Sequence, residues 1–182
     1  ISQKYKRHRP RLLILLGNPA LLMRDEYREL WGDIPIVLCS EENYLGPQET
    51  YTKKQAIATA DRTPLTQLAD PYNMVLLYSN LYLDENIQLI CHIVPEIKKF
   101  IFIGDARQIN QTNNLDIRNK LKKTHPNVEY QFITPQDMTT NQLLDSLYFV
   151  DPKTTGVLFS SWFYKTTFAG NTSLVSNAHK LI

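Results

Sequence analysis

The sequence predicts an α/β fold with parallel sheets and flanking helices, because short apolar runs alternate with longer segments of helical spacing. The clearest run, at residues 100–103, reads FIFI and is followed directly by Gly104 and Asp105. Runs of this length that are rich in aromatic and β-branched residues are typical of strands buried on both faces. Such strands belong to parallel sheets that helices cover on each side. The alternation also requires crossover connections, which are right-handed in nearly all proteins.

Six segments are expected to form the strands, at residues 11–16, 34–39, 74–78, 100–103, 128–133 and 155–160. The segment at 128–133 alternates only partly in polarity, which favours a place nearer the edge of its sheet. Four side chains of the fourth and sixth strands are expected in the hydrophobic core: Phe100, Phe102, Val157 and Phe159.

The segments between the strands carry helix signals. Asn18 is a good N-cap, and Pro19 suits the first position of a helix that runs to about Trp31. Asp84 opens a helix in which Ile87 and Ile90 have helical spacing. The other expected helices are a short one at 52–60, one capped by Asn114 after a polar loop at 106–113, one capped by Thr139 or Thr140, and a last one capped by Thr172 after a loop at 161–170.

Composition gives no reason to expect a nucleic acid or an anionic membrane as partner. The chain of 182 residues has a net charge of +2, and 43% of its residues are hydrophobic, as is ordinary for a globular protein. The basic run at 4–9 reads either as a phosphate-binding arm or as a solvated helix end that leads into the first strand. The two cysteines, Cys39 and Cys91, are expected to be buried free thiols.

No targeting or membrane segment is recognised in the sequence. No apolar run reaches the length of a transmembrane helix, and no signal peptide is present. Because the chain begins with Ile1 rather than Met, we expect a fragment of a longer protein, with any membrane contact made by segments outside it.

Several enzyme classes lack their motifs in this sequence. The phosphate-binding patterns GxGxxG and GxxxxGK[ST] are missing, and so is the GxSxG nucleophile pattern. The four histidines are scattered without the spacing of metal ligands, so no metal or cofactor is expected. Glu41 and Glu42 follow a strand and could form an acid/base pair, although one of two adjacent carboxylates often caps a helix instead.

Two polar segments follow buried strands and are the best candidates for a binding site. Asp105 could serve a polar role in a cleft or could cap the next turn. Ser160 and Ser161 offer hydroxyl groups, and Trp162 beside them offers either a flat apolar contact or core packing. Both readings stay open for each of these residues.

The order of these segments resembles the central part of type I periplasmic substrate-binding proteins. The most similar group is the ABC-transporter substrate-binding-like sensor domain of bacterial histidine kinases, often hybrid two-component ones. The resemblance covers most of the chain apart from 46–71, and its motifs are patterns of strand and helix rather than catalytic signatures. The matching pieces are Lys4-Tyr5-Lys6 leading to 12–16, Pro19-Ala20-Leu21, 34–39 with Asn43 after it, 85–90, 94–99 before IFIGD, and 156–161.

The resemblance implies two Rossmann-like lobes that close on a small ligand, both incomplete in this fragment. Residues 1–79 would be part of lobe one and 80–182 part of lobe two, with a hinge crossing at 78–84. Because the carboxyl ends of parallel strands face a binding crevice, we expect polar residues there to bind the ligand. These are Asn18, Glu41, Glu42 and Asn43 from lobe one, and Gly104, Asp105, Ser160, Ser161 and Trp162 from lobe two.

The function that this resemblance implies is extracytoplasmic ligand sensing for a two-component histidine kinase. The partner would be a small molecule, with a homodimer as one option, and the location would be the periplasmic part of an inner-membrane protein. Three alternatives stay open at this point. They are a transport-associated solute-binding protein, an α/β enzyme that uses Asp105 or Glu42 with Ser160, and an interaction domain that serves only dimerisation.

Overall fold

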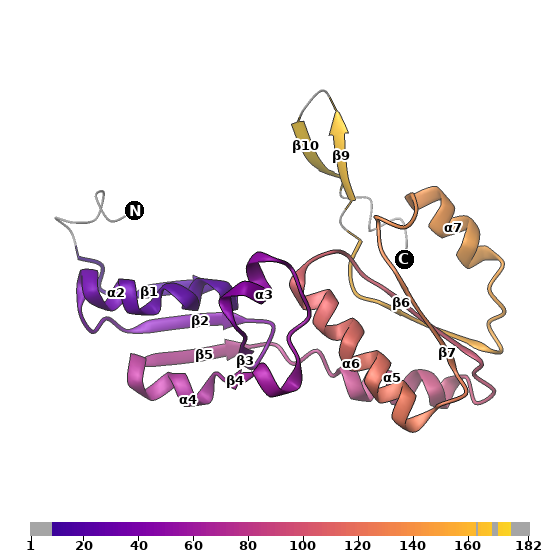
Figure 1. Cartoon of the computed structure of the whole chain (residues 1–182), viewed down its shortest axis with the longest axis horizontal. Helices are drawn as coiled ribbons and strands as arrows, with labels where there is room; N and C mark the ends of the chain where they lie inside the picture. The colour runs from indigo at the N-terminus through magenta and orange to yellow at the C-terminus, as the bar shows by residue number, and fades with distance from the viewer. Residues whose placement is uncertain (1–8, 163, 169–170, 176–182) are drawn as a thin grey trace. The chain divides into compact units, whose positions relative to one another are not determined.

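The computed structural model describes residues 9–162, 164–168 and 171–175 (Figure 1). The chain forms two compact units. The first comprises the described residues of Ile1–Lys53 together with Ile57–Leu81, and the second comprises Lys54–Ala56 together with the described residues of Tyr82–Ile182. Each unit contains a parallel sheet with helices in its connections, so the predicted α/β class is confirmed.

Three parallel strands form the main sheet of the first unit, in the order β1-β2-β5. They are β1 (Leu13–Leu16), β2 (Ile36–Ser40) and β5 (Met74–Tyr78). Leu13 pairs with Ile36, which pairs in turn with Met74, so the three strands begin side by side. Their carboxyl ends therefore lie along one edge of the sheet.

The connection from β1 to β2 contains the 3₁₀ helix η1 (Asn18–Met23) and the helix α2 (Arg24–Trp31). A helical segment was predicted here, but the assignment of Asn18 as its N-cap was wrong. The N-cap is Gly17, whose φ of 82° lies in the left-handed region that glycine adopts most readily. The Asn18 side chain does not cap the helix and instead donates hydrogen bonds to the backbone oxygens of Glu42 and Tyr44.

The connection from β2 to β5 contains several short elements. They are β3 (Tyr44–Leu45), α3 (Gln48–Thr52), η2 (Thr59–Asp61), β4 (Thr63–Pro64), α4 (Thr66–Ala69) and η3 (Asp70–Tyr72), with β3 and β4 antiparallel. The predicted helix at 52–60 was wrong, because α3 ends where that helix should begin. Packing explains the break: a Cβ atom on Gly46 would lie 2.4 Å from Ile57, so the chain after α3 folds back onto the loop after β3.

The sheet of the first unit is covered on one face. Its buried residues include Leu15, Ile36 and Leu38, which pack with Leu21 and Leu65. On β1, by contrast, alternate side chains are exposed, up to 76% for Leu16. The predicted strand at 11–16 is therefore present but buried on one face only. Both connections run in the same direction along the sheet, and right-handed crossovers then place both of them on the same face.

The second unit contains another three-stranded parallel sheet, in the order β7-β6-β8. Its elements, in chain order, are α5 (Leu83–Ile93), β6 (Lys99–Ile103), α6 (Gln108–Thr124), β7 (Glu129–Ile133), α7 (Thr140–Tyr148) and β8 (Thr155–Phe159). The predicted place of β7 at an edge of its sheet is confirmed among the described strands, and β6 lies in the middle. α7 begins with the expected cap, because Thr139 and Gln142 form a capping box.

Two expectations for the second unit were wrong. The helix α6 begins at Gln108, six residues before the expected cap at Asn114, because its first turns carry a polar network instead of an apolar stripe. Where a loop after Ser160 and a last helix capped by Thr172 were expected, the described residues form an antiparallel pair, β9 (Tyr164–Phe168) and β10 (Asn171–Val175). The rest of the expected helix, at 176–182, lies outside the described residues. The threonine-rich sequence of this segment favours strands.

The strand β6 is buried on both faces, as predicted. Phe100 and Phe102 pack on one face against Ile117 and Leu121 of α6. Ile101 and Ile103 pack on the other face against a second cluster of buried residues, which are Ile133, Leu143 and Trp162. Here the connections from β6 to β7 and from β7 to β8 run in opposite directions, so their helices cover opposite faces.

Val157 and Phe159 of the edge strand β8 were expected in the core, but the structure leaves both of them exposed. Val157 is 38% exposed and Phe159 is 37% exposed, because β8 has a neighbouring strand on one side only in the described sheet. The two cysteines are half-buried rather than buried: Cys39 lies on the less covered face of β2, and Cys91 lies on α5.

Phe102 is buried and Phe159 is exposed, so truncating their side chains should cost different amounts of stability. Phe102→Ala removes a fully buried ring that stacks on Phe132 at 5.2 Å, and it should lower the free energy of unfolding by about 3–5 kcal/mol. Phe159→Ala is the matched control and should cost less than half as much. Urea titrations of both variants measure this, and equal losses would contradict the assigned core.

Candidate functional site

The predicted ligand residues follow the carboxyl ends of strands in both units. Asn18 follows β1, and Glu41, Glu42 and Asn43 follow β2. In the second unit, Gly104 and Asp105 follow β6, and Ser160, Ser161 and Trp162 follow β8. The structure gathers some of these residues into one polar cluster in each unit, and it leaves others exposed.

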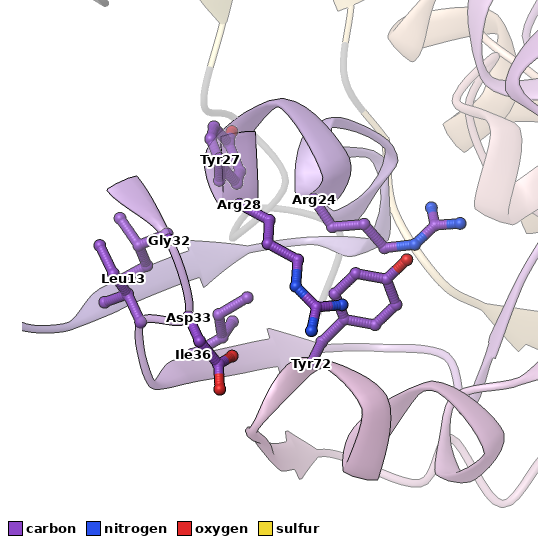
Figure 2. Close-up of a pocket in the computed structure, with 9 residues that line it drawn as sticks. Leu13, Arg24, Tyr27, Arg28, Gly32, Asp33, Ile36 and Tyr72 are labelled. Atoms are coloured by element: carbon purple, nitrogen blue, oxygen red, sulfur yellow. The ribbon is translucent and has the colours of Figure 1, made fainter. Parts of the chain in front are cut away.

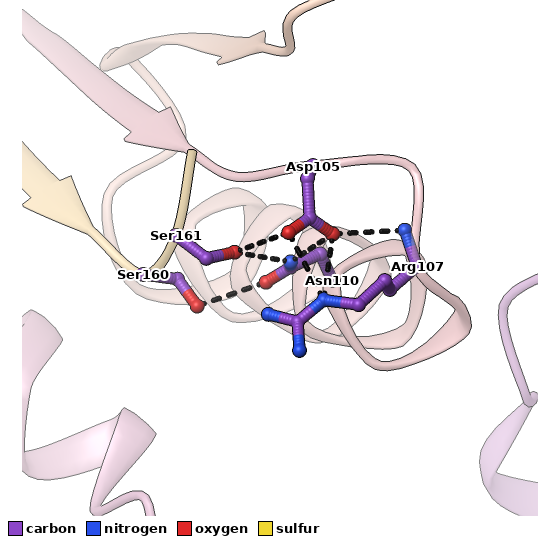
Figure 3. A network of polar contacts seen from close by, with 5 residues as sticks. All are labelled: Asp105, Arg107, Asn110, Ser160 and Ser161. Atoms are coloured by element: carbon purple, nitrogen blue, oxygen red, sulfur yellow. Dashed lines mark hydrogen bonds and ion pairs between the residues drawn. The ribbon is translucent and has the colours of Figure 1, made fainter. Parts of the chain in front are cut away.

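The cluster of the second unit is built around the carboxylate of Asp105, which is 2% exposed (Figure 3). Asn110 donates from Nδ2 to Oδ1 at 2.8 Å, and the Ser161 hydroxyl donates to Oδ2 at 2.8 Å. The backbone N–H of Arg107 donates to Oδ1 at 2.9 Å, and its Nε lies 3.1 and 3.0 Å from the two carboxylate oxygens. Asp105 therefore joins the end of β6 to the start of α6 and to the segment after β8.

These contacts keep Asp105 ionised. Burial by itself would raise the pKa of the carboxyl group. The hydrogen bonds from the Arg107 backbone, Ser161, the Arg107 side chain and Asn110 outweigh burial and lower the pKa below its ordinary value. The hydrogen bond from the Arg107 backbone closes the turn that leads into α6, which is the capping role that the sequence left open for Asp105.

Asn110 connects the cluster to β8, although the sequence analysis did not identify it. Its Nδ2 also lies 2.7 Å from the Ser161 hydroxyl, and its Oδ1 accepts a hydrogen bond from Ser160 at 2.9 Å. The residue was missed because 106–113 was expected to be a loop. The first turns of α6 carry no apolar stripe, so hydrophobic spacing gave no signal that would have extended the helix to Asn110.

Gly104 and Trp162 contact the protein itself. A Cβ atom on Gly104 would lie 3.0 Å from Phe132 and 3.2 Å from Asn110, so the absence of a side chain lets α6 approach the end of β6. Trp162 is buried against Ile103 and its neighbours, and its indole N–H donates to the Thr140 hydroxyl at 3.0 Å. The packing role that the sequence left open for Trp162 is thus present in the structure.

The cluster of the first unit joins the ends of β1 and β2. The Ser40 hydroxyl accepts a hydrogen bond from the Glu42 backbone at 2.9 Å and contacts the side-chain oxygen of Asn18. Asn18 donates to the backbone oxygen of Tyr44, and the Tyr44 hydroxyl donates to Glu42 Oε1 at 2.7 Å. Asn18, Ser40 and Glu42 are all buried, so this cluster also holds two strand ends together.

Tyr51 lies beside this cluster. Its hydroxyl accepts a hydrogen bond from the Gly46 backbone at 3.0 Å. Burial raises the pKa of Tyr51 to about 12, and the nearby charge of Glu42 acts in the same direction. Glu41 and Asn43, by contrast, are exposed on the loop and are not brought into the cluster.

The geometry also bears on the enzyme alternative with Asp105 and Ser160. The Ser160 hydroxyl donates to Asn110, whereas Ser161 bonds Asp105. Nucleophilic catalysis by a serine requires a base that accepts its proton directly. In this geometry Asp105 does not accept the proton of Ser160, because the Ser160 hydroxyl donates to Asn110.

Among the described residues, no group of three or more His, Cys, Asp or Glu side chains is arranged to hold a metal ion.

A search of protein-family models, of curated proteins and of solved structures found no match for this chain. None of the described helices is both long and apolar enough to cross a membrane.

The low pKa of Asp105 predicts how stability depends on pH. Its ionised form stabilises the fold fully above the unfolded-state pKa of about 3.9, and this contribution is lost as the pH falls through the lower folded-state pKa. Asp105→Asn should cost about 2 kcal/mol or more at neutral pH, and the difference from the parent should narrow in acid. Urea unfolding across this pH range measures both quantities.

The exposed Asp145 on α7 provides the matched control. Asp145→Asn removes a carboxyl group from the surface and should leave the stability at neutral pH unchanged. If the difference in the free energy of unfolding between the parent and Asp105→Asn stays constant down to about pH 3, ionisation of Asp105 does not stabilise the fold.

Proposed function

We propose that the chain is part of an extracytoplasmic sensor domain that binds a small solute between two lobes. The observation that carries the proposal is that both parallel sheets end in a polar cluster at their carboxyl ends. Open α/β sheets bind their ligands at this edge. The sequence resemblance to the sensor domains of bacterial two-component histidine kinases agrees with this use of the fold.

Burial divides the proposed ligand residues into two groups. Asn18, Glu42, Asp105 and Ser161 are buried and have partners within their own clusters, so they position the strand ends. Glu41, Asn43 and Ser160 are exposed, and a solute could reach them directly. In this proposal the exposed residues make the contacts, and the buried residues fix where the exposed ones stand.

Arg107 joins the exposed group, although the sequence did not single it out. Its side chain is 48% exposed, and its Nε is held by Asp105 at 3.0 Å. Figure 3 shows the terminal nitrogens of Arg107 on the side away from the Asp105 carboxylate. The positive charge of Arg107 would attract a carboxylate of the solute, and Ser160, whose hydroxyl donates to Asn110, would accept a hydrogen bond from a solute hydroxyl.

Ligand sensing requires no chemical step. A solute that binds one arrangement of the lobes more tightly shifts the population toward that arrangement, and an attached kinase would respond to the shift. The domain is proposed to lie in the periplasm, with membrane segments outside residues 1–182 and a second copy as one further partner.

A thermal-shift screen tests this proposal. Sugars, amino acids, polyols and dicarboxylates are each added to the protein, because a ligand that binds only the folded state raises the Tm. We expect one class to do so. Ser160→Ala and Arg107→Gln should lose most of that rise, since both residues are exposed. Each rise is measured from the variant's own Tm without solute, because the two changes also remove a bond to Asn110 and to Asp105.

Arg118→Gln is the matched control, because Arg118 is an exposed arginine on α6, beyond its first turns. It should retain the full rise in Tm. The proposal fails if no solute class stabilises the parent, or if Ser160→Ala and Arg107→Gln respond as strongly as Arg118→Gln.

A further inference from the structure

Arginines gather at the opposite end of the first unit's sheet, where the strands begin. Arg9 and Arg11 precede β1, and Asp33 precedes β2. Together with Pro10, Ile34 and Pro35, these residues line an open hollow with a volume of about 370 Å³. All of the lining residues belong to the first unit, and none belongs to the clusters at the carboxyl ends.

A smaller pocket adjoins this hollow and shares Asp33 and Ile34 with it (Figure 2). Arg24 and Arg28 enter it from α2, and Tyr72 enters from the segment before β5. The guanidinium carbon of Arg24 lies 5.2 Å from the centre of the Tyr72 ring, and that of Arg28 lies 5.6 Å from it. The guanidinium groups of Arg24 and Arg28 therefore both lie beside the Tyr72 ring.

The protein satisfies these arginines only weakly. Arg9 donates to the Asp33 backbone oxygen at 3.4 Å, beyond the usual length of such a bond. Arg24 donates to the Leu21 oxygen at 3.4 Å and lies 3.9 Å from Asp25, whose carboxylate already accepts the Tyr72 hydroxyl at 2.6 Å. Within the described part of the chain, the Nε of Arg24 is buried without a hydrogen-bond partner.

We propose that this arginine cluster, defined as Arg9, Arg11, Arg24 and Arg28 with Tyr72, binds a phosphate group. Guanidinium groups present paired donors that match phosphate oxygens, and they stack on aromatic rings as Arg24 and Arg28 do here. Four arginines and one aspartate line the two pockets, and a second aspartate, Asp25, lies beside Arg24, so positive charge is in excess. A phosphate monoester, with a charge of about −1.5 to −2, balances this excess better than a carboxylate does.

The hollow is open to solvent, so the phosphate could belong to a soluble molecule or to a lipid headgroup. The binding chemistry is the same for both sources, and two arms of one experiment separate them. The first arm is calorimetric titration with inorganic phosphate at low ionic strength, where screening is weak. The second is sedimentation with vesicles that contain phosphatidate, whose headgroup is a phosphate monoester, compared with phosphatidylcholine vesicles.

The test variant is Arg9→Gln combined with Arg28→Gln, since both side chains are exposed and their neutralisation should not disturb folding. It should bind phosphate at least about tenfold more weakly than the parent. Arg118→Gln in the second unit is the matched control and should bind like the parent. Arg28→Lys keeps the charge but loses the planar fork, and it should fall between the two.

The outcomes separate as follows. Phosphate binding that the double variant loses supports the site, and co-sedimentation with phosphatidate vesicles that is lost in the same variant assigns the source to a lipid. Phosphate binding without co-sedimentation assigns it to a soluble molecule. The proposal is overturned if the parent binds neither phosphate nor vesicles, if the double variant binds like the parent, or if acetate displaces phosphate at equal concentration.

Discussion

The buried carboxylate of Asp105 is the interaction on which the second unit depends. A buried charge is costly unless hydrogen bonds replace its water. Here the donors come from the first turns of α6 and from the segment after β8, so the charge is satisfied only when these parts meet the end of β6. Loss of one donor leaves the charge less satisfied, which is why a single side chain can fix the position of a helix and of a strand end.

Crossover direction explains why the two sheets differ, although their strands look alike in the sequence. The run at 12–16 is as apolar as the run at 100–103. Hydrophobic pattern locates both strands, but it does not contain the strand order. In the second unit the connections run in opposite directions and cover both faces, whereas in the first unit both run the same way. Leu16 is exposed because both connections of the first unit cover the other face of its sheet. Val157 is exposed because the order β7-β6-β8 places its strand at an edge.

Sequence reasoning found the parts of the site that follow directly from a strand, and it missed those that depend on long-range hydrogen bonds. Asp105 and Ser161 were identified because each comes just after a short apolar run. Asn110 was missed because a buried amide in the first turn of a helix leaves no apolar signal. Its partner Ser160 lies 50 residues away in the chain, and no local pattern encodes such a pair. For the same reason the sequence could name the candidate residues but not decide which were buried supports and which were exposed.

The first unit carries two different polar surfaces at the two ends of one sheet. The cluster around Ser40 and Glu42 joins the carboxyl ends of β1 and β2, whereas the arginine cluster surrounds the start of the same strands. A strand rises about 3.3 Å per residue, so the three steps between the four residues of β1 separate these ends by roughly 10 Å. A phosphate group bound at the start of β1 therefore does not contact the cluster at its end. An anion at the arginine cluster would therefore affect solute binding only through a coupling free energy carried by the sheet and by α2, and such coupling acts equally in both directions.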